Sequence, residues 1–270
     1  MAHATSVEVL KPWNGSRFAT AVLEANIAAL KSVVKVRMTA SYRGLDPWLM
    51  LYGVGDPLRS HARRQQLAMR RRVLMWDLGY FGRTPEEKAR YARLSLDDLH
   101  PWRHFSATPN DPTRWQAHGI SLREDSDPDG PVIVIGMGRK SREQLLEYQW
   151  EVNRVREAKA RFPKRKVIYR PKRRESFGGV SVAPEGSIES ALKGASLVIC
   201  RHSNVAIDAC IAGVPVECED GAAYWLYRDN PNPTVDERLD FLHRLAHWQY
   251  RLDEMELAWN FIQVLTKGET

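Results

Sequence analysis

The sequence predicts an α/β protein with two Rossmann-like domains facing a cleft, followed by long C-terminal helices. The chain has 270 residues, which exceeds one average domain and suits two of about 130 residues each. Hydrophobic residues make up 43% of the chain, enough apolar surface for two cores. In the second half, short β-branched runs alternate with amphipathic helical patterns. This alternation is typical of a doubly wound parallel sheet, which binds ligands at the carboxyl ends of its strands.

The second half supports this fold class element by element. Its first strand, Pro131 to Gly138, is a continuous β-branched run bounded by glycine, as in strands buried on both faces. Apolar residues with helical spacing follow from Ser141 to Arg161. The later elements are the strand KVIYRP, a short helix over Gly186 to Lys193, the strand SLVICRH, a helix over Asn204 to Ile211 and the strand VPVEC. The predicted order is therefore β-α-β-α-β-α-β.

The first half and the C-terminal region are less regular. Strands are predicted from Trp48 to Tyr52 and from Val73 to Trp76, and the order of the other elements is left open. Near the C-terminus, Thr234 and Glu237 form a capping box before apolar residues with near-helical spacing, which predicts one or two long helices. Acids, prolines and a glycine cluster as in a linker from Arg123 to Pro131. We therefore expect a first Rossmann-like domain over residues 1–128, a nucleotide-binding one over 129–232, and helices over 233–270 that pack back on them.

An anion site is predicted where the strand SLVICRH ends. The next helix begins at His202-Ser203-Asn204, so unpaired backbone N–H groups and the positive helix end face the ligand side of the sheet. Ser203 is small enough for a phosphate to approach closely. Asp208, about one turn further on, is placed to reach ribose hydroxyls. The alternative is that Ser203 or Asn204 only caps the helix, as such residues do at most helix starts.

The segment from Pro131 to Tyr227 resembles the donor-binding half of type-B glycosyltransferases, especially the capsule-polysaccharide transferase group. Its opening strand and glycine turn, VIVIGMGRKS, correspond to the start of that half. Tyr169-Arg170-Pro171-Lys172 is similar to the basic Lys-Pro-His-Pro-like strand end of the group. The stretches HSNVAIDAC, AGVPVEC and GAAYW are similar to its Ser/Thr-rich turn and helix, its Gly-Lys-Pro-Val turn and its glycine-aromatic segment.

The resemblance implies a metal-independent glycosyltransferase of the type-B fold. It would use a nucleotide sugar, a nucleoside diphosphate sugar in our interpretation, as co-substrate and would need no further cofactor. The implied donor-binding residues are Gly136, Gly138, Arg139, Lys140, Arg170, Lys172, His202, Ser203, Asn204 and Asp208. Two of them depart from the group, because Asp208 stands in place of glutamate and Lys172 in place of histidine. A shorter carboxylate still accepts ribose hydrogen bonds and a lysine still neutralises phosphate, so the class of donor is retained.

A catalytic base is predicted in the first half. Asp77 follows a buried-looking strand in MWDLGYFGR, and an inverting transferase needs a group that takes the proton from the acceptor hydroxyl. Its position is similar to the acidic residue and glycine turn of the capsule group. The alternative is an aspartate that only caps the next turn. Gly53 follows another strand and is expected to line the acceptor side or to form a plain tight turn.

The net charge of +7 favours a polyanionic partner. Six arginines between Arg59 and Arg72, and eight basic residues among the fourteen from Arg161 to Arg174, suit a nucleic-acid track with aromatic platforms, although such runs are usually solvated faces. A hydroxymethylated base of viral DNA, as in a bacteriophage, would be one acceptor. The residues proposed for acceptor or DNA contact are Gly53, Arg63, Arg64, Arg70 and Tyr80.

Other features limit the possible functions. Three cysteines at Cys200, Cys210 and Cys218 match no zinc pattern and are expected to be small buried residues, and the histidines suggest no metal site. No apolar run is long enough to span a membrane and no signal peptide is apparent, so we expect a cytoplasmic protein, in the host cytoplasm if it is viral.

Two alternatives to the glycosyltransferase function stay open. One is a non-catalytic nucleic-acid-binding module of the same fold, and the other is a sugar-nucleotide epimerase.

Overall fold

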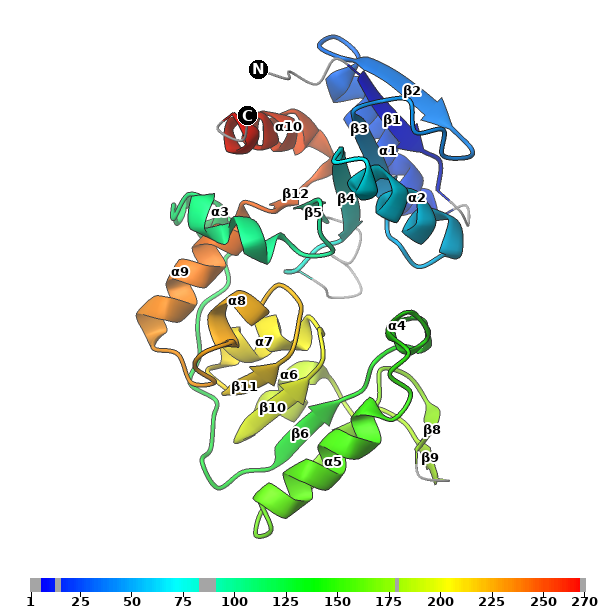
Figure 1. Cartoon of the computed structure of the whole chain (residues 1–270). Coiled ribbons are helices and arrows are strands. Elements are labelled where there is room, and N and C mark those ends of the chain that lie inside the picture. Colours follow the sequence, from blue (N-terminus) through cyan, green and yellow to red (C-terminus); the bar gives the residue numbers. More distant parts are fainter. Residues whose placement is uncertain (1–5, 13–15, 83–90, 178–179, 268–270) are drawn as a thin grey trace. The chain divides into compact units, whose positions relative to one another are not determined.

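The computed structural model describes residues 6–12, 16–82, 91–177 and 180–267 (Figure 1). The chain forms two compact units. Unit 1 comprises Met1–His118 and His243–Thr270, and unit 2 comprises Gly119–Leu242. The chain thus enters unit 2 shortly before the predicted linker, and it returns to unit 1 within helix α9 (Val235–Ala246).

Unit 1 is built on a six-stranded sheet in the order β12-β5-β4-β3-β1-β2. Strands β1 to β4 pair in parallel, whereas β5 and β12 are added antiparallel at one edge. The two predicted strands correspond to β3 and β4. The strands are β1 (Ser6–Leu10), β2 (Lys35–Thr39), β3 (Trp48–Tyr52), β4 (Arg72–Leu78), β5 (Ala92–Leu96) and β12 (Gln249–Tyr250).

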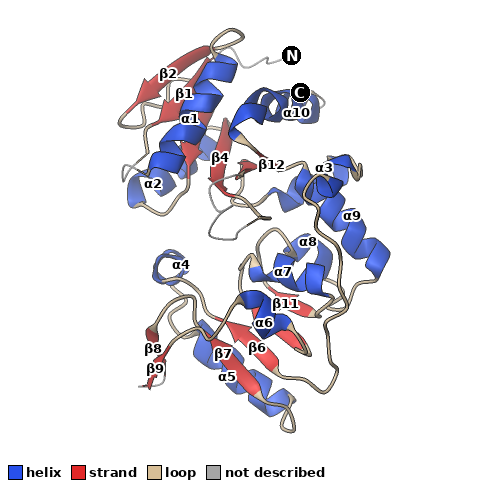
Figure 2. Ribbon diagram, turned by 180° about the vertical axis from the view of Figure 1, so that it is seen from behind, coloured by secondary structure: helices blue, strands red, loops and turns tan. Residues whose placement is uncertain are grey.

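Helices cover both faces of this sheet. Leu49 and Leu51 pack with Ala62 of α2 on one face, whereas Trp48, which directly precedes Leu49 in the strand, points the other way and contacts Trp259 of α10 at a ring distance of 5.5 Å. Helix α1 packs on α10 and β3. The helices, coloured blue in Figure 2, are α1 (Arg17–Leu30), α2 (Pro57–Ala68), η1 (Pro101–Ala107), α3 (Thr113–Gln116), η2 (Leu252–Glu254) and α10 (Met255–Thr266).

Unit 2 contains a four-stranded, wholly parallel sheet in the order β11-β10-β6-β7. The predicted α/β class with Rossmann-like parallel sheets is therefore confirmed. The strands are β6 (Val132–Ile135), β7 (Val167–Arg170), β10 (Leu197–Cys200) and β11 (Val216–Cys218). A separate hairpin of β8 (Glu175–Phe177) and β9 (Val180–Val182) is inserted after β7, which the sequence did not suggest.

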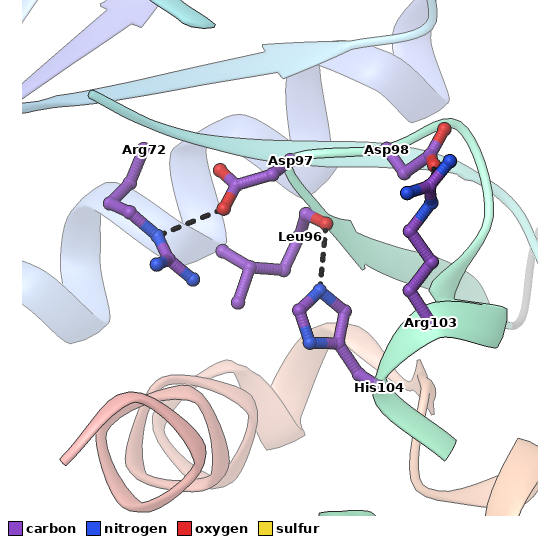
Figure 3. A pocket seen from close by; sticks show the side chains of 6 residues that line it. All are labelled: Arg72, Leu96, Asp97, Asp98, Arg103 and His104. Carbon is purple, nitrogen blue, oxygen red and sulfur yellow. Dashed lines mark hydrogen bonds and ion pairs between the residues drawn. The ribbon is translucent and has the colours of Figure 1, made fainter. Parts of the chain in front are cut away.

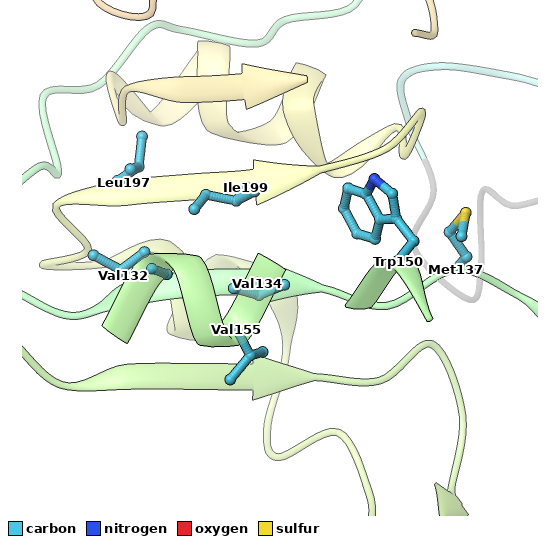
Figure 4. Packing of buried hydrophobic residues seen from close by; sticks show 8 residues of the cluster. Val132, Val134, Met137, Trp150, Val155, Leu197 and Ile199 are labelled. Atoms are coloured by element: carbon cyan, nitrogen blue, oxygen red, sulfur yellow. The ribbon is translucent and has the colours of Figure 1, made fainter. Parts of the chain in front are cut away.

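The core of unit 2 explains which helix covers which face. Val132, Val134, Leu197 and Ile199 pack against Val155 and neighbouring residues of α5 (Figure 4). Helix α7 contacts β10 and β11, and α6 packs on α7. Helix α5 therefore covers one face and α7 the other. The helices are α4 (Arg139–Leu145), α5 (Trp150–Arg161), α6 (Ile188–Leu192), α7 (Val205–Ala212), α8 (Tyr224–Tyr227) and most of α9.

The single helix predicted from Ser141 to Arg161 is wrong, because the chain breaks between α4 and α5. Leu146 adopts a left-handed conformation with φ of 57°. Contacts distant in sequence accompany the break: Glu147 forms an ion pair with Arg201 at 3.0 Å, and the indole of Trp150 donates to Glu219 at 2.8 Å. Tertiary contacts here override a favourable helical pattern.

The C-terminal capping box is confirmed. The backbone N–H of Thr234 donates to the Glu237 carboxylate at 2.7 Å, and the Glu237 N–H donates back to the threonine hydroxyl at 3.3 Å. The predicted closing helices are α9 and α10, with β12 and η2 between them.

We predict that His247, just after α9, makes the stability of the protein sensitive to acid. Burial and then nearby Arg114 lower the pKa of His247 below its ordinary value near 6.5. The unfolded chain therefore binds this proton at a higher pH than the folded chain, so stability is lost as pH falls below about 6.5. In urea titrations from pH 7.5 to 5, His247→Gln should lose less stability than the parent, whereas His61→Gln, at an exposed histidine of α2, should follow the parent. Equal slopes for the parent and His247→Gln would contradict this assignment.

Candidate functional site

The sheet of unit 2 has a topological switch point between β6 and β10. These strands are neighbours, but the helix that packs over β6 and the helix that follows β10 lie on opposite faces. In such sheets, ligands bind just beyond the carboxyl ends of the two strands. Gly136 follows β6 and His202 to Asn204 follow β10, so sequence segments far apart meet at this position.

A hydrogen bond joins the two segments. The Nε2 atom of His202, after β10, lies 3.1 Å from the hydroxyl of Ser141 on α4. The Ser203 hydroxyl accepts the N–H of Val205, the first residue of α7, at 3.2 Å, while Asn204 is the N-cap residue of this helix. Helix α7 then runs for eight mostly buried residues to Gly213, whose left-handed φ of 72° ends it. Asp208 lies in the first turn of α7 and is half-buried.

The basic side chain of Lys172 lies beside the glycine turn. A Cβ atom built at Gly138 would lie 3.8 Å from the Lys172 ammonium. At Gly136 a Cβ atom would lie only 2.6 Å from the hydroxyl of Tyr169, so a larger residue does not fit there without displacing that ring. The structure thus brings together Gly136, Gly138, Lys172 and the His202 segment.

Other predicted donor residues are placed less favourably. Arg170 bonds the backbone carbonyls of Glu185 and, at 2.7 Å, Gly186, so its guanidinium is engaged in holding a loop. Arg139 and Lys140 are exposed in the first turn of α4, and Arg139 lies 3.7 Å from Glu143. The guanidinium of Arg170 therefore already holds this loop, and its role in donor binding stays a prediction.

A polar network supports the glycine turn, and the sequence pattern did not reveal it. Buried Glu151 on α5 accepts the backbone N–H of Met137 at 2.9 Å and the Arg142 guanidinium at 2.7 Å. Arg142 also pairs with Glu175 of the hairpin at 2.8 Å. Burial and the bond to Glu175 raise the pKa of the Tyr169 phenol, which therefore stays protonated. Because the Met137 N–H is occupied, this turn offers fewer donors to a ligand than a free glycine loop.

In unit 1, Asp77 lies within β4 and not after it. Its carboxylate is 40% exposed and forms an ion pair with Arg93 at 3.0 Å. Gly53 directly follows β3, with a left-handed φ of 65°, and its N–H donates to the Trp76 carbonyl at 2.7 Å. Both therefore lie near the carboxyl ends of parallel strands, where the fold class places ligands.

The arginine-rich segment of unit 1 is used mainly inside the protein. Four of its six arginines contact other groups of unit 1, namely Arg59 with Asp56, Arg63 with Asp98, Arg71 with the Gly44 carbonyl and Arg72 with Asp97. Arg64 and Arg70 are exposed. Tyr80 is only 1% exposed, so the expected stacking platform at this residue is wrong for this structure.

A pocket of about 380 Å³ lies at the opposite end of β4 (Figure 3). Arg72, at the start of β4, pairs with Asp97 at 3.0 Å, and Arg103 pairs with Asp98 at 3.0 Å. His104 contacts the Leu96 carbonyl at 3.2 Å. The charges of this pocket are thus largely matched within the protein, and the pocket is separated from Asp77 by the length of the strand.

Two further observations concern the part of the chain that the structure describes. No group of three or more His, Cys, Asp or Glu side chains there is arranged to hold a metal ion. None of the helices there combines the length and apolar character needed to cross a bilayer. Cys200 and Cys210 are buried as expected, whereas Cys218 is only partly buried, and burial raises the pKa of the Cys200 and Cys210 thiols to about 12.

Comparison with known proteins supports the fold. No protein-family description matches the sequence, and no curated protein matches it. Among solved structures, the Thermosulfurimonas dismutans KpsC, beta Kdo 2,4 transferase, is similar with a TM-score of 0.53 and 12% identity over 92% of each chain. The KpsC beta Kdo 2,7 transferase from the same organism is similar with a TM-score of 0.51 and 12% identity, over 96% of this chain and 99% of that one. At this identity the likeness establishes a shared fold.

Proposed function

We propose that the protein is a glycosyltransferase that moves a sugar from a nucleotide-sugar donor, a nucleoside diphosphate sugar in our assignment, to a hydroxyl group of an acceptor. The observation that carries this proposal is the position of His202, Ser203 and Asn204. They follow β10 at the switch point of the parallel sheet and lead directly into α7. The fold shared with two Kdo transferases agrees with it.

The proposed chemistry uses leaving-group stabilisation. The start of α7 has partial positive charge, and the Lys172 ammonium lies beside the neighbouring Gly138. Both would stabilise negative charge that develops on the departing phosphate, in a mechanism that we propose to be metal-independent. Asp208 would accept ribose hydrogen bonds from the first turn of α7.

Asp77 would accept the proton of the acceptor hydroxyl. Its carboxylate is partly exposed, which allows contact with an incoming substrate, and it lies near the carboxyl end of β4. The finer proposal, a hydroxymethylated base in DNA as acceptor, rests on the net charge of +7 and on exposed basic residues such as Arg64 and Arg70. The internal contacts of the other arginines leave it with less support than a generic hydroxyl acceptor.

Donor binding is the first test of the function. Thermal unfolding in the presence of uridine, cytidine, guanosine and adenosine nucleotide sugars should show a selective stabilisation, of about 2.7 kcal/mol for a donor at 100 times its dissociation constant. No stabilisation by any of them, together with salt-dependent DNA binding, would favour a non-catalytic nucleic-acid-binding module. A rearranged sugar nucleotide recovered without any acceptor would indicate an epimerase.

A further inference from the structure

The Asp77 carboxylate belongs to a cluster that extends from the surface into unit 1. Asp77 and Arg93 are direct cross-strand partners in the antiparallel pair β4 and β5. The Arg93 Nη2 atom donates to Asp77 Oδ2 at 3.0 Å. The backbone N–H of Leu78 donates to the other carboxylate oxygen, Oδ1, at 2.8 Å. Both oxygens are thereby held in one orientation, and each keeps a lone pair for another proton.

The second Nη atom of the Arg93 guanidinium also has a partner. Arg93 Nη1 lies 3.0 Å from Nδ1 of His100, and its guanidinium carbon lies 5.1 Å from the centre of the Tyr80 ring. Because arginine has only donors, His100 Nδ1 must be the acceptor of this bond. His100 and Tyr80 are 6% and 1% exposed, so both are parts of the interior.

The ionic states of this cluster are well defined. Burial alone lowers the pKa of an arginine, but the negative charge and the hydrogen bond of Asp77 act in the opposite direction, so the pKa of Arg93 is raised and the guanidinium stays charged. Burial raises the pKa of Tyr80 to about 12, so its phenol stays neutral at physiological pH. The cluster therefore presents one fixed cation to Asp77.

The turn after β4 is fixed from another part of the chain. The Gln249 side-chain carbonyl on β12 accepts the N–H groups of Tyr80 and, at 2.9 Å, Phe81. At Gly79 a Cβ atom would lie 2.7 Å from the same oxygen, so the turn passes very close to Gln249. These bonds set the position of the Tyr80 ring against Arg93.

The two partners of the ion pair differ in their exposure to solvent. The Asp77 side chain is 40% exposed, whereas that of Arg93 is only 14% exposed. Burial of a guanidinium costs free energy of folding, and a partly exposed ion pair adds little stability in return. Stability alone therefore does not account for this pair. In functional sites, buried partners of this kind usually fix the orientation of a reacting group.

We propose that Arg93 is the positioning residue of Asp77: clamped between His100 and Tyr80, it holds the carboxylate in the orientation in which it accepts the acceptor proton. This inference rests on the proposed transferase function. Lysine cannot replace this arginine, because a single ammonium lacks the planar fork that reaches Asp77 and His100 at once.

Kinetics of variants test the catalytic part of this inference. Arg93→Met should lower kcat on the order of 100-fold while leaving the KM for the donor unchanged, because only the orientation of the base is lost. Arg93→Lys should restore little of this loss. In an Asp77→Asn background, Arg93→Met should cause no further loss, since the two residues act as one unit. Additive losses, or a raised donor KM with normal kcat, would overturn the inference.

A matched control lies at the other end of the same strand. Arg72→Met removes an arginine–aspartate pair of similar length, 3.0 Å between Arg72 and Asp97, from the start of β4. This variant should keep the parent's kcat. A loss equal to that of Arg93→Met would show that any disturbance of β4 suffices, and would overturn the proposed role of Arg93.

A structural measurement separates this inference from the proposed function. In crystals of the ligand-free proteins, the Asp77 carboxylate should occupy one rotamer in the parent and in Arg72→Met, and other or several rotamers in Arg93→Met. If Arg93→Met does not fold, Arg93→Lys serves in its place. An unchanged carboxylate would overturn the positioning role even in an active transferase. An altered carboxylate in a protein that binds no nucleotide sugar would support the positioning role while the proposed function fails.

Discussion

Replacing Ser203 with tryptophan is expected to abolish binding of the nucleotide-sugar donor. The Ser203 hydroxyl lies 3.2 Å from the Val205 nitrogen, directly before α7 and at the place where the donor phosphates are proposed to lie. An indole there would occupy the space that phosphate oxygens need to reach the helix start. We expect affinity to fall at least 100-fold, which corresponds to about 2.8 kcal/mol of binding free energy. Donor-dependent melting shifts provide the measurement.

The control for this substitution is Ser203→Ala. Loss of the hydrogen bond from the Val205 N–H should lower the stability of the free protein by about 1 kcal/mol, while the small side chain leaves the phosphate position open. Donor-dependent shifts should therefore survive in Ser203→Ala and vanish in Ser203→Trp. If they survive in both variants, the phosphates bind elsewhere and the assignment of α7 is wrong.

Asp77→Asn is expected to remove most turnover while donor binding stays nearly intact. The amide has the shape of the carboxylate but cannot take up the acceptor proton, and loss of a general base typically costs 10²–10⁴-fold in rate. The donor residues belong to unit 2, whereas Asp77 belongs to unit 1, so the melting shift with donor should be preserved. Single-turnover transfer to an identified acceptor provides the measurement.

Asp97→Asn is the matched control for Asp77→Asn. Asp97 is also an aspartate of unit 1 paired with an arginine, at 3.0 Å from Arg72, but it directly follows β5 and lies beside Val73, near the start of β4. Its backbone has a left-handed φ of 61°, which asparagine tolerates well. This variant should retain turnover. Full activity in Asp77→Asn would exclude Asp77 as the base and leave the donor assignment standing.

The sequence pattern predicted those helices and strands that are specified by neighbouring residues. The β-branched runs of β6 and β10 and the strand-to-helix step at Ser203 are each contained in about ten neighbouring residues. The capping box of Thr234 and Glu237 is equally local, and its reciprocal hydrogen bonds form as expected. The bounds of β6 and the break at Leu146 were missed, because turns and long-range ion pairs determine where these elements end.

The supporting residues of the site had only a weak signal in the sequence. Arg93 occupies one position of the alternating strand ARLSL, a pattern that suggests a strand but not its partner. Only the register of β4 against β5 places Arg93 opposite Asp77. Likewise, the basic cluster resembled a nucleic-acid track until the acidic and carbonyl partners of its arginines were visible.

The sequence by itself determined the α/β class, the parallel arrangement implied by alternating strands and helices, and the candidate helix start at Ser203, because periodicity and capping act over a few residues. Tertiary structure alone decided that Tyr80 is buried, since the bond that fixes its backbone comes from Gln249, 169 positions away. It also decided that Arg170 holds a loop and that Arg93 holds Asp77. The physical reason is that hydrogen bonds and ion pairs depend on which strands become neighbours, and a local pattern does not specify those neighbours.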